Sequence, residues 1–399
     1  MDLADASICM TYESGPTEFD DFPQTDEPVH ILGHAYSTLY DLEELKHDIL
    51  SRIWITYRKN FSPIGGTGPT ADTGWGCMLR CGQMMMAQCL IVRHLGRGWR
   101  WRKSSYENDK TYMKILRLFQ DKRTSYYSIH QIASMGVSEG KTVGSWFGPN
   151  TIAQVLKKIS VYDEWSSIVT HVAMDNTVIE DDIRTLCKSH ANKENTQQGS
   201  NPVPAGTASA ACPSSGDTVK EGASSWSPLL LIIPLRLGLT DINSLYFNSL
   251  KLCLSLKQSV GIIGGKPNHA HWFIGTVGDE LVYLDPHTTQ PVVDLDEVGS
   301  RDDSYHCPHS SRMKVQQLDP SVALGFFCLN EQEFDDLCNA FRSKMVSKTP
   351  MFELHRKRPK HWPADSYVAA AAAAATGATK TVYANADFCD TEEEFELLG

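Results

Sequence analysis

Two short runs of the sequence carry the residue types needed to cleave an amide bond with a thiol. Gly74-Trp75-Gly76-Cys77 begins an apolar stretch, and Asp285-Pro286-His287 ends another one much later in the chain. A cysteine supplies a nucleophile, a histidine can act as its base, and a carboxylate can orient that base. These three side chains are the minimum set for a cysteine peptidase, provided that the fold brings the two runs together.

The residues around Cys77 predict a sharp loop followed by a helix. Residues 65–76 contain five glycines, which tolerate a positive φ, and the run from Met78 to Ile91 holds many good helix formers and no proline. A thiol in the first helical turn meets unpaired amides and the positive end of the helix dipole. Both favour the thiolate, and the amides can form half of an oxyanion hole. The alternative is that Cys77 is a small buried apolar residue.

The residues before Asp285 predict a β-hairpin. Residues 271–277 and 281–285 are rich in β-branched and aromatic side chains, and Gly278-Asp279-Glu280 between them is typical of a turn. In an extended chain, the side chains of Asp285 and His287 leave on the same face. A carboxylate beside an imidazole selects its tautomer and stabilises the imidazolium. The pattern alone is also compatible with a solvated aspartate and histidine at a strand end.

These runs closely resemble the autophagins, which are autophagy-related cysteine peptidases. The matching runs are residues 31–33, 54–61, 73–84, 144–151, 264–268, 283–290 and 319–328. They occur in the family's order, they cover about residues 28–362, and they are most similar to the vertebrate B-type autophagin.

The resemblance implies a papain-like α+β fold with a small inserted lobe, and it suggests roles for individual residues. Cys77 would be the nucleophile, His287 the base and Asp285 the residue that orients the base; in papain itself that residue is an asparagine following the histidine. Tyr57 would complete an oxyanion hole with the Cys77 amide, and Trp146 would cover the nucleophile. The expected substrate-gating loop consists of Gly264, Gly265, Lys266, Pro267 and Asn268.

The resemblance also implies a substrate class. Autophagins cleave ubiquitin-like autophagy modifiers of the light-chain-3 and GABARAP types just after a glycine near the C-terminus. They also remove the same modifiers from phosphatidylethanolamine. Three alternatives stay open at this point: a general deubiquitinase, a transglutaminase-like acyl transferase, and a catalytically idle module that only binds a modifier.

Composition sets further bounds. The formal net charge of −11 argues against unaided nucleic-acid binding. Eleven cysteines are scattered without a disulfide rhythm, and the first residues form no basic or apolar signal, so a reduced, cytoplasmic monomer is expected. No segment is long and apolar enough to span a bilayer, so membrane contact is expected to be peripheral and through the substrate.

The chain divides into three predicted parts. Residues 1–27 are polar and acidic and are expected to form a flexible arm. Residues 28–362 would form the catalytic domain, interrupted at about residues 194–225 by an insert that is too poor in large apolar residues to pack. Residues 363–399 would form a disordered tail.

The end of that tail carries a second motif. Phe395, Glu396, Leu397 and Leu398 follow three glutamates and give an aromatic-x-x-aliphatic spacing. Such a peptide can add to a sheet edge with two anchor side chains in pockets. The motif resembles those that bind ubiquitin-like autophagy modifiers. An equivalent motif is not evident in the N-terminal arm.

Other reactive residues are weighed and largely set aside. The pairs His269 with His271 and His306 with His309 fit no closed zinc site, so neither a metal nor another cofactor is expected. Cys81 lies one helical turn after Cys77, where it could condense with an oxidised nucleophile as a redox switch, or simply pack as a helix cysteine.

Overall fold

The computed structural model describes residues 21–103, 109–198, 226–265, 267–297, 299–345 and 350–359. Its α-helices are α1 (Leu42–Leu50), α2 (Cys77–His94), α3 (Lys110–Arg117), α4 (Ile129–Gly136), α5 (Pro149–Ser160), α6 (Glu180–Gln198), α7 (Phe247–Ser255) and α8 (Glu331–Lys344). Its strands are β1 (Val29–Ile31), β2 (His34–Tyr36), β3 (Arg58–Lys59), β4 (Val169–Val172), β5 (Thr177–Ile179), β6 (Leu229–Arg236), β7 (Ser259–Gly264), β8 (His271–Val277), β9 (Glu280–Leu284), β10 (Gln290–Pro291), β11 (Ser311–Lys314), β12 (Ser321–Cys328) and β13 (Glu353–His355).

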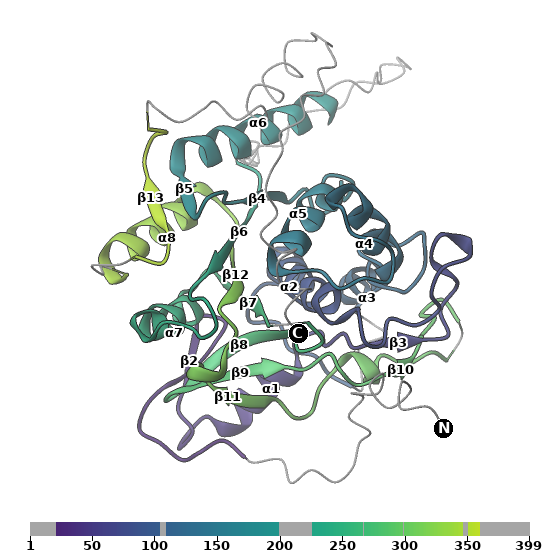
Figure 1. Cartoon of the computed structure of the whole chain (residues 1–399), viewed down its shortest axis with the longest axis horizontal. Coiled ribbons are helices and arrows are strands. Elements are labelled where there is room, and N and C mark those ends of the chain that lie inside the picture. Colours follow the sequence, from purple (N-terminus) through teal and green to yellow (C-terminus); the bar gives the residue numbers. More distant parts are fainter. Residues whose placement is uncertain are drawn as a thin grey trace, which may run out of the picture.

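One large sheet organises the molecule (Figure 1). Among the described residues its strand order is β11-β9-β8-β7-β12-β6-β4, with β1 paired to β8 and β2 to β1. The neighbouring strands are antiparallel except for β4 and β6, which run parallel. β12 pairs along its whole length with β6 on one side and contacts β7 on the other. The strand of this sheet that comes last in the sequence therefore lies inside it.

The sheet separates two apolar cores because its inner strands are buried on both faces. In β6, Leu230 and Ile232 belong to the core that contains α2 and α5. The intervening Leu229, Leu231 and Ile233 belong to the core that contains α7 and α8. This alternation follows from the two-residue period of a strand, and a strand covered on both faces reads as a continuous apolar run. Helices accordingly lie on both sides of the sheet in Figure 1.

Helix α2 is buried nearly all round. Every residue from Cys77 to Ile91 is buried, and the helix packs against β7 and β8 on one side and α5 on another. Gly82 allows the approach of α5, because a Cβ at this position would lie 2.4 Å from Ile152 Cγ1. Gly325 likewise allows β12 to approach α2, because a Cβ at this position would lie 2.7 Å from Met85 Cε.

The α+β class and several predicted elements are confirmed. A helix begins at Cys77, and β8 and β9 form the predicted hairpin. Helix α6 continues through Gln198, so its last turn enters the segment predicted to be an insert; residues 199–225 lie outside the described ranges.

The described end of the predicted N-terminal arm contacts the body. The Thr25 amide donates to Thr38 Oγ1 at 3.0 Å, and Lys46 donates to Asp21 Oδ2 at 2.9 Å. Residues 1–20 and the tail after residue 359, with its motif, lie outside the described ranges. Within those ranges, no helix combines the length and the apolar character that a bilayer crossing would need.

Candidate active site

Cys77 is the first residue of α2 and is fully buried. The preceding loop is a tight turn in which the amides of Trp75 and Gly76 donate to the carbonyl of Asp72 at 3.2 and 2.8 Å. Gly74 has a φ of +86°, which a residue without a Cβ adopts at little cost. The loop therefore delivers the thiol to the helix start, as the glycine pattern predicted.

An ionic cluster of Asp72, Arg80 and Asp121, here called the nucleophile-loop cluster, holds this turn. Arg80, one turn into α2, donates to both oxygens of Asp72 at 2.7 and 3.0 Å and to Asp121 Oδ1 at 2.8 Å. All three side chains are buried. A Cβ at Gly76 would lie 2.2 Å from Asp72 Oδ2, so the carboxylate packs directly beneath the residue before Cys77.

The same carboxylate contacts the start of β3, directly after Tyr57. Asp72 Oδ1 accepts a hydrogen bond from the Arg58 amide at 2.7 Å. Tyr57 is buried, and burial raises the pKa of its hydroxyl strongly, with a further contribution from electrostatic interaction with the neighbouring Cys77. The Tyr57 ring meets His287 edge to face, with ring centroids 5.5 Å apart. Tyr57 therefore borders both Cys77 and His287, as an oxyanion-hole residue would.

Asp285 and His287 form a hydrogen-bonded pair. His287 Nδ1 donates to Asp285 Oδ1 at 2.5 Å, and the His287 amide donates to the same oxygen at 2.9 Å. The expected extended geometry is wrong in one respect: β9 ends at Leu284, and the second bond closes a turn around Pro286. The pair forms because an aspartate readily accepts from the amide two residues on.

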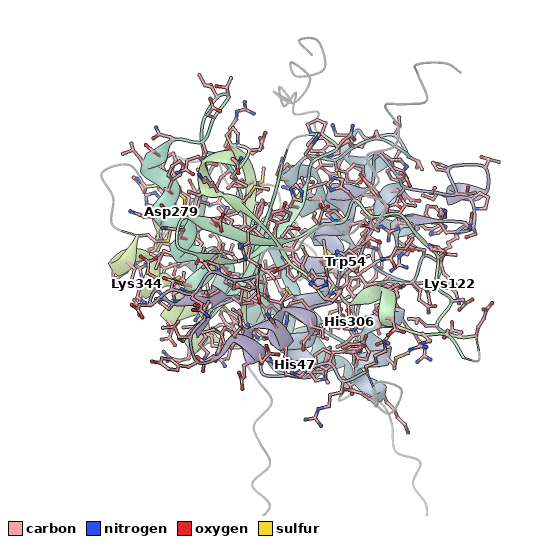
Figure 2. The ribbon with its side chains drawn as sticks, turned by 90° about the horizontal axis from the view of Figure 1, so that it is seen from below. His47, Trp54, Lys122, Asp279, His306 and Lys344 are labelled. Carbon is pink, nitrogen blue, oxygen red and sulfur yellow. The ribbon has the colours of Figure 1, made fainter. Side chains whose placement is uncertain are left out.

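The ends of this turn are fixed to the segment before Tyr57. Trp54 Nε1 donates to the carbonyl of Asp285 at 2.7 Å, and the Tyr57 amide donates to that of Pro286 at 2.9 Å. The Trp54 amide also donates to the carbonyl of Tyr305, next to His306, and both Trp54 and His306 are labelled in Figure 2. These bonds join the turn that holds the Asp285–His287 pair to the segment that carries Tyr57.

The electrostatics of the pair favour a charged imidazole. Burial alone would lower the pKa of His287, but the hydrogen bond to Asp285 and the interactions with the Cys77 thiol outweigh it and raise the pKa to about 9. His287 Nε2 is buried and forms no hydrogen bond with a described residue. The Cys77 thiol therefore lies near this nitrogen without being bonded to it. The pKa of Asp285 is lowered, because the interactions with His287 outweigh its burial.

His271 lies beside the pair, which local sequence gave no reason to expect. Its Nε2 is 3.9 Å from Asp285 Oδ2, and its ring centroid is 5.3 Å from that of His287. It begins β8 opposite Gly264, the first residue of the predicted gating loop. Burial lowers the pKa of His271 to about 4, so the ring is neutral at neutral pH.

The predicted gating loop connects β7 to β8 and is tightly folded where it is described. Gly265 has a φ of +134°, and a Cβ there would lie 2.2 Å from the His269 carbonyl oxygen. Asn268 also has a positive φ, and His269 Nδ1 donates to the Pro267 carbonyl at 3.0 Å. Lys266 lies outside the described residues. Trp146 lies in the loop before α5, partly buried against the core that contains Cys77.

The other candidate residues are in structural surroundings. Cys81 is buried, and burial raises the pKa of its thiol well above the ordinary value, with Cys77 and Asp285 acting in the same direction. A neutral thiol is a poor nucleophile, which weighs against a redox role. His306 is buried, with Nδ1 donating to the Leu50 carbonyl and Nε2 in contact with the Tyr112 hydroxyl.

The arrangement can support acyl transfer through a thiol. A buried cysteine at a helix start, an imidazole held by a carboxylate and a phenol beside both are brought together from three separate segments. Sequence reasoning missed the supports Asp72, Arg80 and Trp54. The sequence does offer a signal for Asp72 and Arg80. They are charged residues beside an apolar, buried stretch, where each would need a partner of opposite charge.

Comparisons with known proteins agree with this geometry. The Peptidase C54 catalytic domain model matches residues 42–340. Chicken cysteine protease ATG4B is 53% identical over 368 residues, covering 88% of this chain and 90% of the relative. Cysteine protease ATG4A from Xenopus laevis is 48% identical over the whole of both chains, and human ATG4A is 48% identical over 98% of this chain and 99% of its own. The chain therefore belongs to the peptidase C54 family, the autophagin cysteine peptidases of autophagy.

Proposed function

We propose that this cysteine peptidase cleaves ubiquitin-like autophagy modifiers after a glycine near their C-terminus and also releases them from phosphatidylethanolamine. The observation that carries the proposal is the Asp285–His287 pair beside the buried Cys77 at the start of α2. Both reactions break an amide formed by the glycine carboxyl group, so one acyl-transfer site serves both.

The chemistry uses Cys77 as the nucleophile. Its sulfur attacks the glycine carbonyl carbon, and the thiol proton passes to His287. The Cys77 amide and the Tyr57 hydroxyl donate to the oxygen that becomes negative. His287 then protonates the departing amine, which leaves a thioester. Water attacks the thioester with His287 as base, and the thiol and the glycine carboxylate are released.

Several surroundings of Cys77 suit a glycine substrate. Trp146 covers the approach in this proposal, and a substrate side chain at the scissile residue would clash in a channel narrowed by it. In this proposal the loop from Gly264 to Asn268 gates entry of the substrate; Gly265 and Asn268 both have a positive φ, which gives the loop a tight shape. Asp285 orients His287 and stabilises its charged form.

We further propose that the tail residues Phe395 to Leu398 dock on a modifier of the light-chain-3 or GABARAP type, away from the cleft. The enzyme would act as a cytoplasmic monomer and meet membranes only through its lipid-linked substrate. The cysteines in the described ranges are free thiols, which suits a reducing compartment. Replacing both Phe395 and Leu398 by alanine should weaken modifier capture in calorimetry with the Cys77→Ser protein. An unchanged affinity would contradict the docking role.

The decisive experiment presents four substrates to the full chain: modifiers extended past the glycine, modifiers linked to phosphatidylethanolamine in vesicles, extended ubiquitin and a simple amine acceptor. Cleavage of the first two is expected, with a loss of at least ~10³-fold in Cys77→Ser. Rapid cleavage of extended ubiquitin would favour a general deubiquitinase, and transfer to the amine would favour an acyl transferase. Normal turnover by a folded Cys77→Ser protein would exclude the proposed nucleophile.

A further inference from the structure

Three metal-binding side chains meet beside the nucleophile. One ligand atom from each of His271, Asp285 and His287 lies within 4.8 Å of the others, and in the described part of the chain they form the only group of this kind. His271 begins β8 and His287 follows the end of β9, and the pairing of Trp272 with Leu284 places both histidines at the open end of the hairpin. Sequence spacing alone pairs His271 with His269 instead, and therefore does not predict this group.

The donor set suits a borderline divalent cation. Two imidazoles and a carboxylate are frequent zinc ligands, and they leave a fourth tetrahedral position for water. His271 Nε2 and Asp285 Oδ2 are 3.9 Å apart, too far for a hydrogen bond. Zinc ligands at 2.0–2.2 Å from the ion are about 3.3 Å from one another, so only small rotations are required.

The site is also accessible from solvent. The side chains of His271 and Asp285 are 13% and 23% exposed, so an ion can enter. The Asp285 carboxylate offers an anionic oxygen, which complements the charge of a divalent cation.

We propose that His271, Asp285 and His287 bind one Zn²⁺ ion, and that this ion reversibly inhibits the enzyme. Binding would replace the proton on His287 Nδ1, which leaves to solvent, and would take the Asp285 oxygens away from the ring. The imidazole could then no longer be oriented or charged as the reaction requires. The inhibition rests on the proposed function, whereas the binding does not.

Binding is tested first, without any assay of activity. ZnCl₂ is titrated by calorimetry into the full-length Cys77→Ser protein, which lacks the thiol as a competing ligand. One ion per chain is expected, and His271→Gln should weaken its binding by at least ~10-fold. The matched control is His94→Gln. Burial also lowers the pKa of His94 to about 4, but His94 lies at the far end of α2, about 25 Å along the helix from Cys77. Equal binding by His271→Gln and the parent would overturn the site.

Inhibition is tested second, with the thiol intact. Zinc should inhibit cleavage by the unmutated enzyme over the concentration range in which it binds, and a chelator should restore the rate. Each variant is compared with its own zinc-free rate, and His271→Gln should need at least ~10-fold more zinc while His94→Gln should not. If zinc binds only when Cys77 is present, the ion lies on the thiol and the proposed ligand set is wrong. If zinc binds at His271 but leaves the rate unchanged, the inhibitory role is wrong.

Discussion

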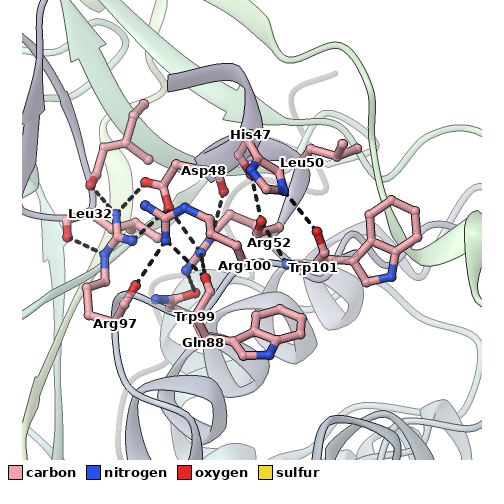
Figure 3. A network of polar contacts seen from close by, with 12 residues as sticks. Leu32, His47, Asp48, Leu50, Arg52, Gln88, Arg97, Trp99, Arg100 and Trp101 are labelled. Atoms are coloured by element: carbon pink, nitrogen blue, oxygen red, sulfur yellow. Dashed lines mark hydrogen bonds and ion pairs between the residues drawn. The ribbon is translucent and has the colours of Figure 1, made fainter. Parts of the chain in front are cut away.

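Two buried ionic clusters fasten α2 to the rest of the molecule, and they have opposite composition. In the nucleophile-loop cluster, two carboxylates surround one arginine, Arg80. In the second, here called the Asp48 cluster, three arginines surround one carboxylate (Figure 3): Arg52, Arg97 and Arg100 contact Asp48 at 3.0, 2.7 and 2.9 Å. The first lies under the start of α2, and the second lies beyond its end.

The composition of each cluster decides how its carboxylates titrate. Asp72 is fully buried, and burial raises its pKa despite the charge of Arg80. Burial also acts to raise the pKa of Asp48, but the charges of Arg52, Arg97 and Arg100 outweigh it and lower the pKa to about 2. Arg97 and Arg100 are partly exposed, so solvent shares the excess positive charge. In the nucleophile-loop cluster, beside the catalytic residues, the charge of Asp72 therefore lowers the stability of the fold. In the Asp48 cluster, far from them, the charge of Asp48 raises it.

The largest expected effect is that of replacing Asp72, which distinguishes the positioning of the catalytic residues from the stability of the fold. Asp72→Asn should lower kcat by about 10²-fold, because Asp72 holds both the Cys77 turn and Arg58, next to Tyr57, and a shift of an ångström in a reacting group has that cost. It should destabilise the fold by only about 1 kcal/mol, the cost of a lost hydrogen bond, because burial already makes the charge of Asp72 unfavourable. Steady-state kinetics and urea unfolding measure the two effects. A loss of stability with kcat intact would show that the cluster only holds the fold.

The matched change in the other cluster should affect stability alone. Asp48→Asn leaves three arginines without their carboxylate and should cost about 3 kcal/mol. Turnover per folded molecule should stay within about twofold, because Asp48, within α1, binds Arg52 and Arg97 rather than a catalytic residue, and Arg97 in turn contacts β1. The same kinetics and urea unfolding apply. A fall in kcat comparable to that of Asp72→Asn would remove the distinction between the clusters.

A smaller effect should appear with pH. The folded pKa of Asp48, about 2, lies below its unfolded value near 3.8, so its charge stabilises the fold above pH ~4. That contribution, about 2 kcal/mol, should disappear as the pH falls from ~4 to ~2. Asp72 has a raised pKa, so its protonation at low pH should instead stabilise the fold. Urea midpoints between pH 5 and 2 should therefore fall less steeply in Asp48→Asn than in the parent protein.

The smallest expected effect concerns the exposed edge of the Asp48 cluster. Arg100→Lys keeps the charge but loses the fork that contacts Asp48 and the Tyr36 hydroxyl together. Because this arginine is partly exposed, the cost should be below about 1 kcal/mol. Thermal unfolding would detect it. A cost as large as that of Asp48→Asn would mean that the exposed arginines carry the attachment.

Sequence reasoning reached what is local and missed what depends on distant pairing. The helix at Cys77 and the β8–β9 hairpin follow from helix-forming residues and turn residues, and the papain-like α+β class is confirmed. The partnership of Arg80 with Asp121 and the approach of His271 to Asp285 depend on how separate elements pack. A single sequence does not encode such packing in any short pattern. The roles predicted for Cys77, Asp285, His287 and Tyr57 stay predictions, although the geometry suits them.

The place of β12 inside the sheet has a consequence for biosynthesis. A ribosome releases α2 long before residues 321–328, yet α2 packs against strands that β12 must pair with to complete the sheet. Until then, the methionine-rich surface of α2 lacks its cover and an open sheet edge persists, which are conditions that recruit chaperones and promote aggregation. The thiol likewise meets its imidazole only in a nearly complete chain. A nascent or truncated molecule would therefore be prone to aggregation and would lack peptidase activity.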